Sequence, residues 1–293
     1  MHDPNSRAEA ARHNALTCGS GWCRDLADFR DYSLEDDAVV RMLARITRPG
    51  RKASLPRCVD WREYCGPVED EQGLNTSSAH ACVALIQQLE RRSSGRLLHL
   101  SRKFAHHTAR RMAGGGTDTA ISLRTVLKAA VRFGIPPEKY LPYDTSSFER
   151  EPDSFAYSFQ RDYRALRYLR LDSPRSAAVE VLERLRLFLA GGFPIAFGFT
   201  LHNSITNDAE IAFPTRQDAV VGGQAVTAVG FDDRLRIRSD KGALLIRNSW
   251  GADWGDGGYG WLPYAYITER LAVDFWTFLK PSWLRSGEFE LVA

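Results

Sequence analysis

Residues 78–92 constrain the fold of this chain more than any other segment. Apolar side chains crowd the segment and recur at Ala81, Val83, Ala84, Leu85, Ile86 and Leu89. A helix that is apolar nearly all round is enclosed by other parts of the protein, whereas a surface helix keeps one polar face. The pattern therefore predicts a helix that passes through a core, with the remaining elements packed around it.

The segments on either side predict two kinds of neighbour for this helix. Shorter helical patterns occupy residues 36–47, 122–133 and 176–190. Apolar runs separated by glycine- and aspartate-rich turns predict strands over residues 194–201, 225–233, 242–250 and 259–264. Helices that precede strands in this way are typical of an α+β fold.

The order of the elements also predicts how the chain is divided. We expect one domain over residues 55–285, with a helical lobe at about 55–165, a β lobe at about 166–285 and a cleft between them. Residues 1–54 are expected to form a lead-in across the main body. The lead-in is expected to be partly flexible, because its first residues are polar.

The charge of the chain argues against two classes of partner. The formal net charge is only +3, with both signs interspersed, so neither a nucleic-acid surface nor a membrane surface is expected. We find neither a signal-peptide pattern at the start nor an apolar run of about 20 residues. Arginine is dense at 91–92, 110–111 and 161–170, which we interpret as solvated helix faces.

The cysteines predict a reducing compartment. The chain has five, Cys18, Cys23, Cys58, Cys65 and Cys82. An odd number with scattered spacing is a poor disulfide framework, and no paired histidines accompany them as in a zinc site. We therefore expect a cytoplasmic protein with no metal and no cofactor.

Three ordered segments resemble the papain-like (C1 family) cysteine peptidases. They are LPRCVDWREYCGPVEDEQG at 55–73, VGGQAVTAVGFDD at 221–233 and IRNSWGADWGDGGYG at 246–260. LSR at 100–102 and DFWT at 274–277 make the chain most like the bacterial branch. The resemblance runs from about Ser20 to Thr277. It implies a two-lobed α+β fold, with a central helix of the helical lobe packed against the β-rich lobe and a cleft between the lobes.

The resemblance also assigns positions to the catalytic groups of that family. Such a site needs a thiolate nucleophile, an imidazole base, an asparagine that orients the imidazole and a glutamine that helps to hold the oxyanion. The asparagine falls on Asn248 and the histidine position on Gln224. The cysteine position falls on Ser77 in an ungapped alignment, with Glu71 at the oxyanion position. Counting from Gln72 and Gly73 places them on Ser78 and Gln72 instead.

These replacements predict a catalytically inactive homologue. Serine depends on a neighbouring base more than cysteine does, and the amide of Gln224 neither accepts nor releases a proton near neutral pH. His80 is expected to be a polar residue of the central helix, and His106 and His107 are expected to be solvated or to cap a helix. His202 is the histidine expected to approach the cleft. No residue is therefore expected to act in catalysis.

The remaining site residues are expected to form cleft walls. These are Gly115, Gly116, Gly223, Trp250 and His202. The triple glycine at 114–116 lacks the lysine and the strand context of a phosphate-binding loop, so a turn at the edge of the cleft is the better interpretation.

The sequence favours a non-catalytic protein that binds a peptide or protein partner through the former cleft or a nearby surface. Two alternatives stay open. One is a serine-dependent hydrolase or acyltransferase with a displaced base. The other is a structural subunit of a complex, for which we expect a cleft blocked by side chains or by residues 1–50. The sequence determines neither the partner nor the oligomeric state.

Overall fold

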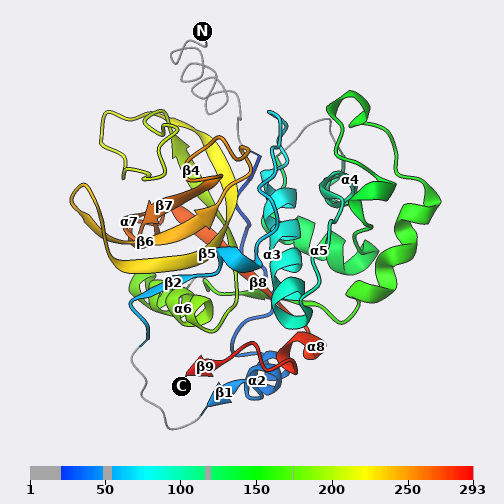
Figure 1. The fold of residues 1–293 in the computed structure, drawn as a ribbon, viewed down its shortest axis with the longest axis horizontal. Helices are drawn as coiled ribbons and strands as arrows, with labels where there is room; N and C mark the ends of the chain where they lie inside the picture. The colour runs from blue at the N-terminus through cyan, green and yellow to red at the C-terminus, as the bar shows by residue number, and fades with distance from the viewer. Residues whose placement is uncertain (1–20, 49–54, 116–119, 174, 293) are drawn as a thin grey trace.

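The protein folds into a helical lobe and a β lobe with helix α3 between them (Figure 1). The structure is a computed structural model and describes residues 21–48, 55–115, 120–173 and 175–292. The α-helices are α2 (Asp37–Leu43), α3 (Ser77–Ser94), α4 (Arg102–Met112), α5 (Leu123–Phe133), α6 (Ala178–Ala190), α7 (Ala265–Thr268) and α8 (Pro281–Leu284). Short 3-10 helices are η1 (Arg62–Tyr64), η2 (Glu138–Tyr140), η3 (Thr145–Ser147) and η4 (Ser154–Tyr163).

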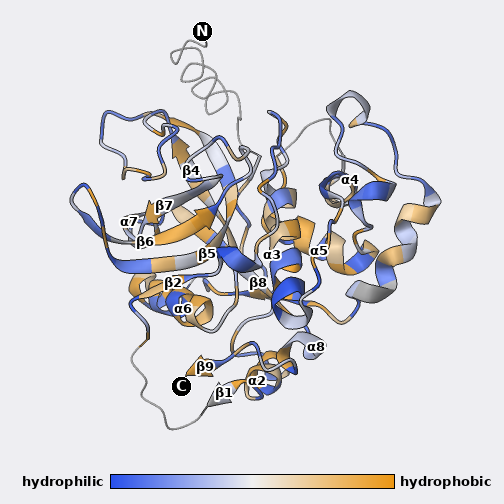
Figure 2. Cartoon of the chain, viewed as in Figure 1, coloured by the Kyte–Doolittle hydropathy of each residue, from blue (hydrophilic) through white to orange (hydrophobic). Residues whose placement is uncertain are grey.

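The β lobe is built on one antiparallel sheet. Its strands are β2 (Cys58–Asp60), β3 (Arg167–Arg170), β4 (Ile195–His202), β5 (Val220–Ile237), β6 (Asp240–Arg247), β7 (Tyr259–Pro263) and β8 (Ala272–Leu279). Six strands follow the order β3-β8-β4-β5-β6-β7, and β2 pairs with the long strand β5. Hydrophobic residues gather on this sheet and on α5 and α6 (Figure 2).

Helix α3 is buried as the sequence predicts. Ala79, Cys82, Leu85 and Leu89 on it are fully buried. The helix ends at Gly95, whose left-handed φ of 71° places its N–H on the carbonyl of Arg91. The two neighbouring helices begin at serine caps: Ser101 accepts the N–H of Phe104, and Ser122 accepts that of Thr125. These helices, α4 and α5, pack on α3 and form most of the helical lobe.

The last part of the lead-in meets the C-terminal segment below the lobes. Strand β1 (Thr47–Arg48) pairs in parallel with β9 (Leu291–Val292), next to α2 and α8 (Figure 1). Earlier in the lead-in, Tyr32 forms a parallel bridge with Leu169 of β3, and the N–H of Arg170 donates to the carbonyl of Tyr32. Residues 21–48 are therefore part of the packed structure. Residues 1–20, which the sequence analysis included in the lead-in, lie outside the described residues.

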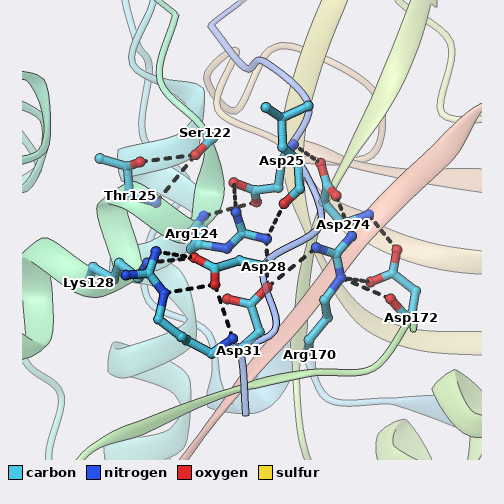
Figure 3. A network of polar contacts seen from close by, with 12 residues as sticks. Asp25, Asp28, Asp31, Ser122, Arg124, Thr125, Lys128, Arg170, Asp172 and Asp274 are labelled. Carbon is cyan, nitrogen blue, oxygen red and sulfur yellow. Dashed lines mark hydrogen bonds and ion pairs between the residues drawn. The ribbon is translucent and has the colours of Figure 1, made fainter. Parts of the chain in front are cut away.

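A buried network of charges fastens the lead-in between the lobes (Figure 3). The N–H of Asp25 donates to Asp274 Oδ2 at 2.7 Å, and the N–H of Arg124 donates to Asp25 Oδ2 at 3.1 Å. The guanidinium of Arg124 also pairs with Asp31 at 2.6 Å. We call this network of Asp25, Asp31, Arg124, Arg170, Asp172 and Asp274 the lead-in latch.

Arg170 is the cation that neutralises the lower half of the latch. Its guanidinium contacts Asp274 at 2.8 Å, Asp172 at 3.1 Å and Asp31 at 3.7 Å. Asp274 is fully buried and has a left-handed φ of 60°. Burial is the main cause that raises the pKa of Asp274 to about 7. The latch therefore holds four carboxyl groups and two guanidinium groups. Burial favours the neutral form of one of these carboxyl groups, that of Asp274.

The interpretation of the arginine clusters as solvated helix faces is confirmed for Arg111 of α4, which is 61% exposed, and is wrong for other members of the clusters. Arg170 lies on a strand and is buried in the latch. Arg92 is half-buried and stacks on Trp61, with its guanidinium carbon 4.0 Å from the ring centre. Arg110 is buried and pairs with Glu149 at 2.7 Å. The carboxylates and rings that accept these cations come from distant segments, so local sequence gave no sign of them.

Replacing Arg170 tests the latch. We expect Arg170→Met to lower the free energy of unfolding by about 3–5 kcal/mol, because it leaves buried carboxylates without their cation. Urea denaturation measures the change. The matched control is Arg234→Met, which removes an arginine that is 64% exposed and 3.6 Å from Asp232. Equal losses in the two variants would contradict the role given to the latch.

Candidate functional site

The loop before α3 carries Glu71 into the space between the lobes. Asp70 bridges Trp250, and the N–H of Glu71 donates to the carbonyl of Ser249 at 2.8 Å. The next residue, Gln72, has a φ of 53° and turns outward, with its N–H on Asp70 Oδ1. Of the two residues considered for the oxyanion position, Glu71 is therefore buried in the site and Gln72 is exposed.

The two serines at the start of α3 face different neighbours. Ser77 Oγ accepts the backbone N–H of Ala225 in β5 at 3.2 Å. Ser78 Oγ donates to the carbonyl of Ile121 at 2.7 Å, on the side of the helical lobe. Both side chains are buried. Ser77 thus lies against the strand that carries Gln224, while Ser78 ties α3 to the segment before α5.

Gln224 is the centre of the polar contacts in the site. It is fully buried on β5, opposite Phe199 of β4. Its Nε2 is 2.9 Å from Glu71 Oε1, 3.2 Å from Asn248 Oδ1 and 3.2 Å from Ser249 Oγ. The amide therefore donates to a group from each lobe and joins the loop before α3 to the segment after β6.

Asn248 and Trp250 complete this network. Asn248 Oδ1 accepts the N–H of Ser249 at 2.9 Å in addition to its contact with Gln224. Trp250 Nε1 donates to Glu71 Oε1 at 2.9 Å, so that one carboxyl oxygen accepts two N–H groups. The Trp250 ring packs edge-on against Trp254. Asn248 thus accepts a hydrogen bond from the amide of Gln224, and the carboxyl of Glu71 accepts hydrogen bonds from Gln224 and Trp250.

The electrostatics of the site favour a neutral Glu71. Burial raises its pKa to about 8, and the hydrogen bonds from Gln224 and Trp250 oppose this rise. At neutral pH the site therefore contains a carboxylic acid and amides, and no charged base. Ser77 has an N–H donor on its oxygen, and none of its described partners accepts a proton. This arrangement does not activate a serine hydroxyl.

The histidines considered as substitutes have other surroundings. His80 Nδ1 is 3.1 Å from the carbonyl of Thr76, its ring packs against Tyr143, and burial lowers its pKa to about 3. His106 and His107 are buried inside α4, so the expectation that they are solvated or capping was wrong: His106 packs against Phe148, and His107 Nε2 is 3.2 Å from Glu151.

His202 lies at the end of β4, three residues beyond the partner of Gln224. At the rise of a β-strand this displaces it by about 10 Å along the strand. The structure therefore places His202 some distance along the sheet from Gln224 and the neighbouring Ser77.

The lead-in covers the serine end of α3. A Cβ on Gly21 would lie 2.6 Å from Ser77 Oγ, so the backbone of the lead-in rests directly on that side chain. The carbonyl of Gly21 also accepts the hydroxyl of Ser78 at 3.3 Å. The next side chain, Trp22, is only 8% exposed. The indole lies over Gly198 of β4 and Gly223 of β5, two positions where any Cβ would overlap its ring.

This contact was missed by sequence reasoning, although the signals for it were present. Gly198 interrupts an otherwise bulky strand, and Gly223 precedes Gln224. A glycine inside a strand often marks the close approach of another group. The sequence assigned Gly223 to a cleft wall for a partner, whereas the structure places the chain's own Trp22 there.

Two glycines were also expected to line the cleft. Gly115 is exposed after α4, with a φ of 65°. Gly116 lies outside the described residues. A cavity of about 20 Å³, whose mixed lining includes His80, Val226 and Asn248, has room for little more than a water molecule.

The described residues offer neither a metal site nor a membrane-spanning helix. Among residues 21–48, 55–115, 120–173 and 175–292, no three His, Cys, Asp or Glu side chains are placed to hold a metal ion. Within the same ranges, no helix combines the length and the apolar character needed to cross a membrane.

The comparison with family models identifies the fold. The model of the papain family cysteine proteases matches residues 55–267. The chain belongs to the papain family. An uncharacterised peptidase C1-like protein of Acanthamoeba polyphaga mimivirus is 32% identical over 184 residues, which are 60% of this chain and 57% of that protein. Fruit bromelain of Ananas comosus is 23% identical over 71% of this chain and 54% of its own length. The chain thus spans little more than half the length of these curated relatives.

Solved structures of papain-family proteins show the same architecture. Xylellain, a cysteine protease from Xylella fastidiosa, is 29% identical and superposes with a TM-score of 0.69 over 89% of this chain and 96% of its own. A procathepsin B from Trypanosoma congolense, at 15% identity, shares the fold with a TM-score of 0.64 over 92% and 88%. The papain-like α+β fold predicted from the sequence is therefore confirmed.

Replacing Glu71 tests its neutral state. A carboxyl whose pKa rises from 4.5 to about 8 on folding stabilises the protein in its protonated form. That stability is complete below about pH 4.5 and falls by about 1.4 kcal/mol per pH unit as the pH rises toward 8. Glu71→Gln keeps an oxygen acceptor and cannot titrate. We therefore expect urea denaturation between about pH 6 and 8 to show a smaller stability loss in Glu71→Gln, by on the order of 2 kcal/mol.

Titration of Asp274 in the lead-in latch does not affect this comparison. Asp274, with a pKa of about 7, titrates in both proteins and cancels in the difference. Parallel pH profiles for the natural chain and Glu71→Gln would contradict a neutral Glu71.

Proposed function

We propose that this chain is a non-catalytic member of the papain family that acts by binding a protein partner. The observation that carries the proposal is the hydrogen-bonded unit of Glu71, Gln224 and Trp250 beside Ser77. An acid at the oxyanion position and an amide at the base position support each other, because the amide N–H needs an acceptor and the buried carboxyl needs donors. The two replacements together make a stable polar contact from positions that serve catalysis in the family.

The chemistry argues against a serine-dependent enzyme with a displaced base. A hydroxyl nucleophile needs a base within hydrogen-bond reach, and the described partners of Ser77 supply an N–H group only. Loss of the base alone costs orders of magnitude in enzymes of this kind. A hydrolase or acyltransferase therefore has less support from the geometry than a binding protein.

The position of the lead-in supports one of the two binding surfaces considered. Gly21 and Trp22 rest on Ser77, Gly198 and Gly223, and the latch fastens the residues that follow. A partner that entered this part of the cleft would have to displace a buried indole and a network of buried charges. The geometry thus favours a partner that docks on a surface outside the covered cleft.

The covered cleft also supports a second candidate function, that of a structural subunit in a complex. Such a subunit is expected to have its cleft closed by residues 1–50, and Trp22 with the latch provides such a closure. This candidate differs from the first in its partner surface, which would be extensive and permanently buried.

We also propose a reducing compartment such as the cytoplasm. Its support is chemical, because Cys23, Cys58, Cys65 and Cys82 are free thiols in the described structure. The likeness to xylellain over 89% of this chain supports the narrower placement with bacterial members of the family.

A cleavage assay distinguishes an active site that is covered by the lead-in from a site that lacks catalytic activity. The natural chain, Trp22→Ala and Ser77→Ala would each be incubated with a proteome-derived peptide pool, and new termini read by mass spectrometry. We expect no new termini from any of them, because uncovering Ser77 in Trp22→Ala restores no base.

New termini from Trp22→Ala that disappear when Ser77→Ala is added would refute the proposal. They would identify a serine hydrolase held closed by its lead-in.

A further inference from the structure

The helical lobe contains an apolar groove at the far end of α3. It encloses about 320 Å³ and is lined by Ile86, Leu98, Leu100, Ile135, Pro137, Phe159, Tyr163, Leu166 and Trp283, with Glu90, Arg96 and Lys280 among them. This size and an apolar lining with few polar groups are typical of ligand sites. At 1.5 Å per residue, Glu90 lies about 20 Å along α3 from Ser77, so the groove is remote from the former catalytic position.

Exposed aromatic side chains extend the groove onto the surface. Phe159 in its wall contacts Tyr140 and Phe155, and the three rings pack with their centres 5.0–5.6 Å apart. Phe155 is 52% exposed and Tyr140 is 42% exposed. Large exposed aromatic side chains beside an apolar hollow mark interaction surfaces. The occupant of the groove therefore covers more surface than the hollow alone offers.

The charges around the groove are predominantly positive. Glu90 is the carboxylate in its lining, and it is already satisfied by Trp283 Nε1 at 2.7 Å and by an ion pair with Arg96. Lys280 lies 3.9 Å from Glu90, and Lys139 sits over the ring of Tyr140 at 4.9 Å. Arg96 and Lys280 thus flank the one carboxylate in the lining, and Lys139 adds a third cation beside the exposed rings. An occupant with a negative charge is favoured over one with a positive charge.

We propose that this groove docks a short segment of a partner protein that carries large apolar side chains next to a carboxylate. The apolar side chains fill the hollow between Leu98 and Trp283 and pack on Phe155. The carboxylate pairs with Arg96 and Lys280, which are held in place by Glu90. This inference rests on the proposed binding function and locates its partner surface on the helical lobe, outside the covered cleft.

Fluorescence anisotropy with labelled peptides tests the chemistry of the occupant. The probe is a fluorescein-labelled glycine-rich decapeptide with a Phe-Leu core flanked by glutamates. One matched probe has lysines in place of the glutamates, and another has alanines in place of Phe and Leu. We expect the acidic apolar probe to bind and each matched probe to bind at least about tenfold more weakly, with affinity falling as salt rises.

Variants of the groove locate the binding. Phe155→Ala and Arg96→Glu are each expected to raise the Kd of the acidic apolar probe about tenfold or more. Their matched controls are Phe29→Ala, at an aromatic side chain that is 98% exposed, and Arg234→Glu. Arg96 and Arg234 are 70% and 64% exposed, and each lies beside one carboxylate. The controls are expected to leave the Kd unchanged, and all four proteins to unfold at similar urea concentrations.

Three results would overturn the proposal. The first is the absence of probe binding at millimolar concentration, and the second is equal binding by the groove and control variants. The third is a different occupant. Displacement of the probe by sodium decanoate at lower concentration than by unlabelled peptide would indicate a small amphipathic acid. Self-association of the natural chain that is lost in both Phe29→Ala and Phe155→Ala would indicate a second copy.

The test also separates this proposal from the proposed function. Anisotropy would be repeated with Ser77→Ala, which cannot use that hydroxyl in catalysis. Cleavage of the peptide pool would refute the non-catalytic function, while probe binding by Ser77→Ala would still support the groove. Failure of probe binding without any cleavage would refute the groove alone.

Discussion

The burial of α3 between the two lobes is the constraint on which the rest of the structure depends. One end of the helix places Ser77 against the backbone of β5, and the other end places Glu90 on the indole of Trp283. A helix without a solvated face brings its polar groups into the interior, where each needs a partner. The sheet, the helical lobe and the C-terminal segment all supply such partners, so the two lobes are joined through this helix.

Gln224 and Glu71 show how buried polar side chains in this interior supply hydrogen-bond partners for each other. The sequence resemblance predicts that Gln224 and Glu71 stand at the positions of the family's histidine and oxyanion glutamine, and the side chains of these two residues lie 2.9 Å apart. The pair gives the Gln224 N–H group an acceptor and Glu71 Oε1 a donor, while Glu71 Oε2 and Gln224 Oε1 have no hydrogen-bond partner among the described residues. Asn248 Oδ1 still accepts a hydrogen bond in this chain. The donor is the amide of Gln224, whereas in the family it is an imidazole. Retention of that residue is therefore compatible with loss of chemistry.

The lead-in contributes to the same interior. Trp22 fills the space over two glycines, and the latch compensates the charges of Asp25 and Asp31 with Arg124 and Arg170. The covered cleft and the apolar groove at the other end of α3 both agree with the proposed binding function, in which the partner docks on the helical lobe and outside the covered cleft.

The sequence by itself determined the α+β class, the buried central helix and most strand positions, because periodicity and turn residues act locally. The NSWG segment and its neighbours also predicted the family, which the family model confirms over residues 55–267, and the replacement of catalytic positions, which stays a prediction. The sequence left the choice between Glu71 and Gln72 open, since a turn with left-handed φ at Gln72 decides which side chain points inward. It also missed the burial of Arg170. Only the tertiary structure decided these points, because the partners that Trp22, Gln224 and Arg170 need come from distant segments of the chain.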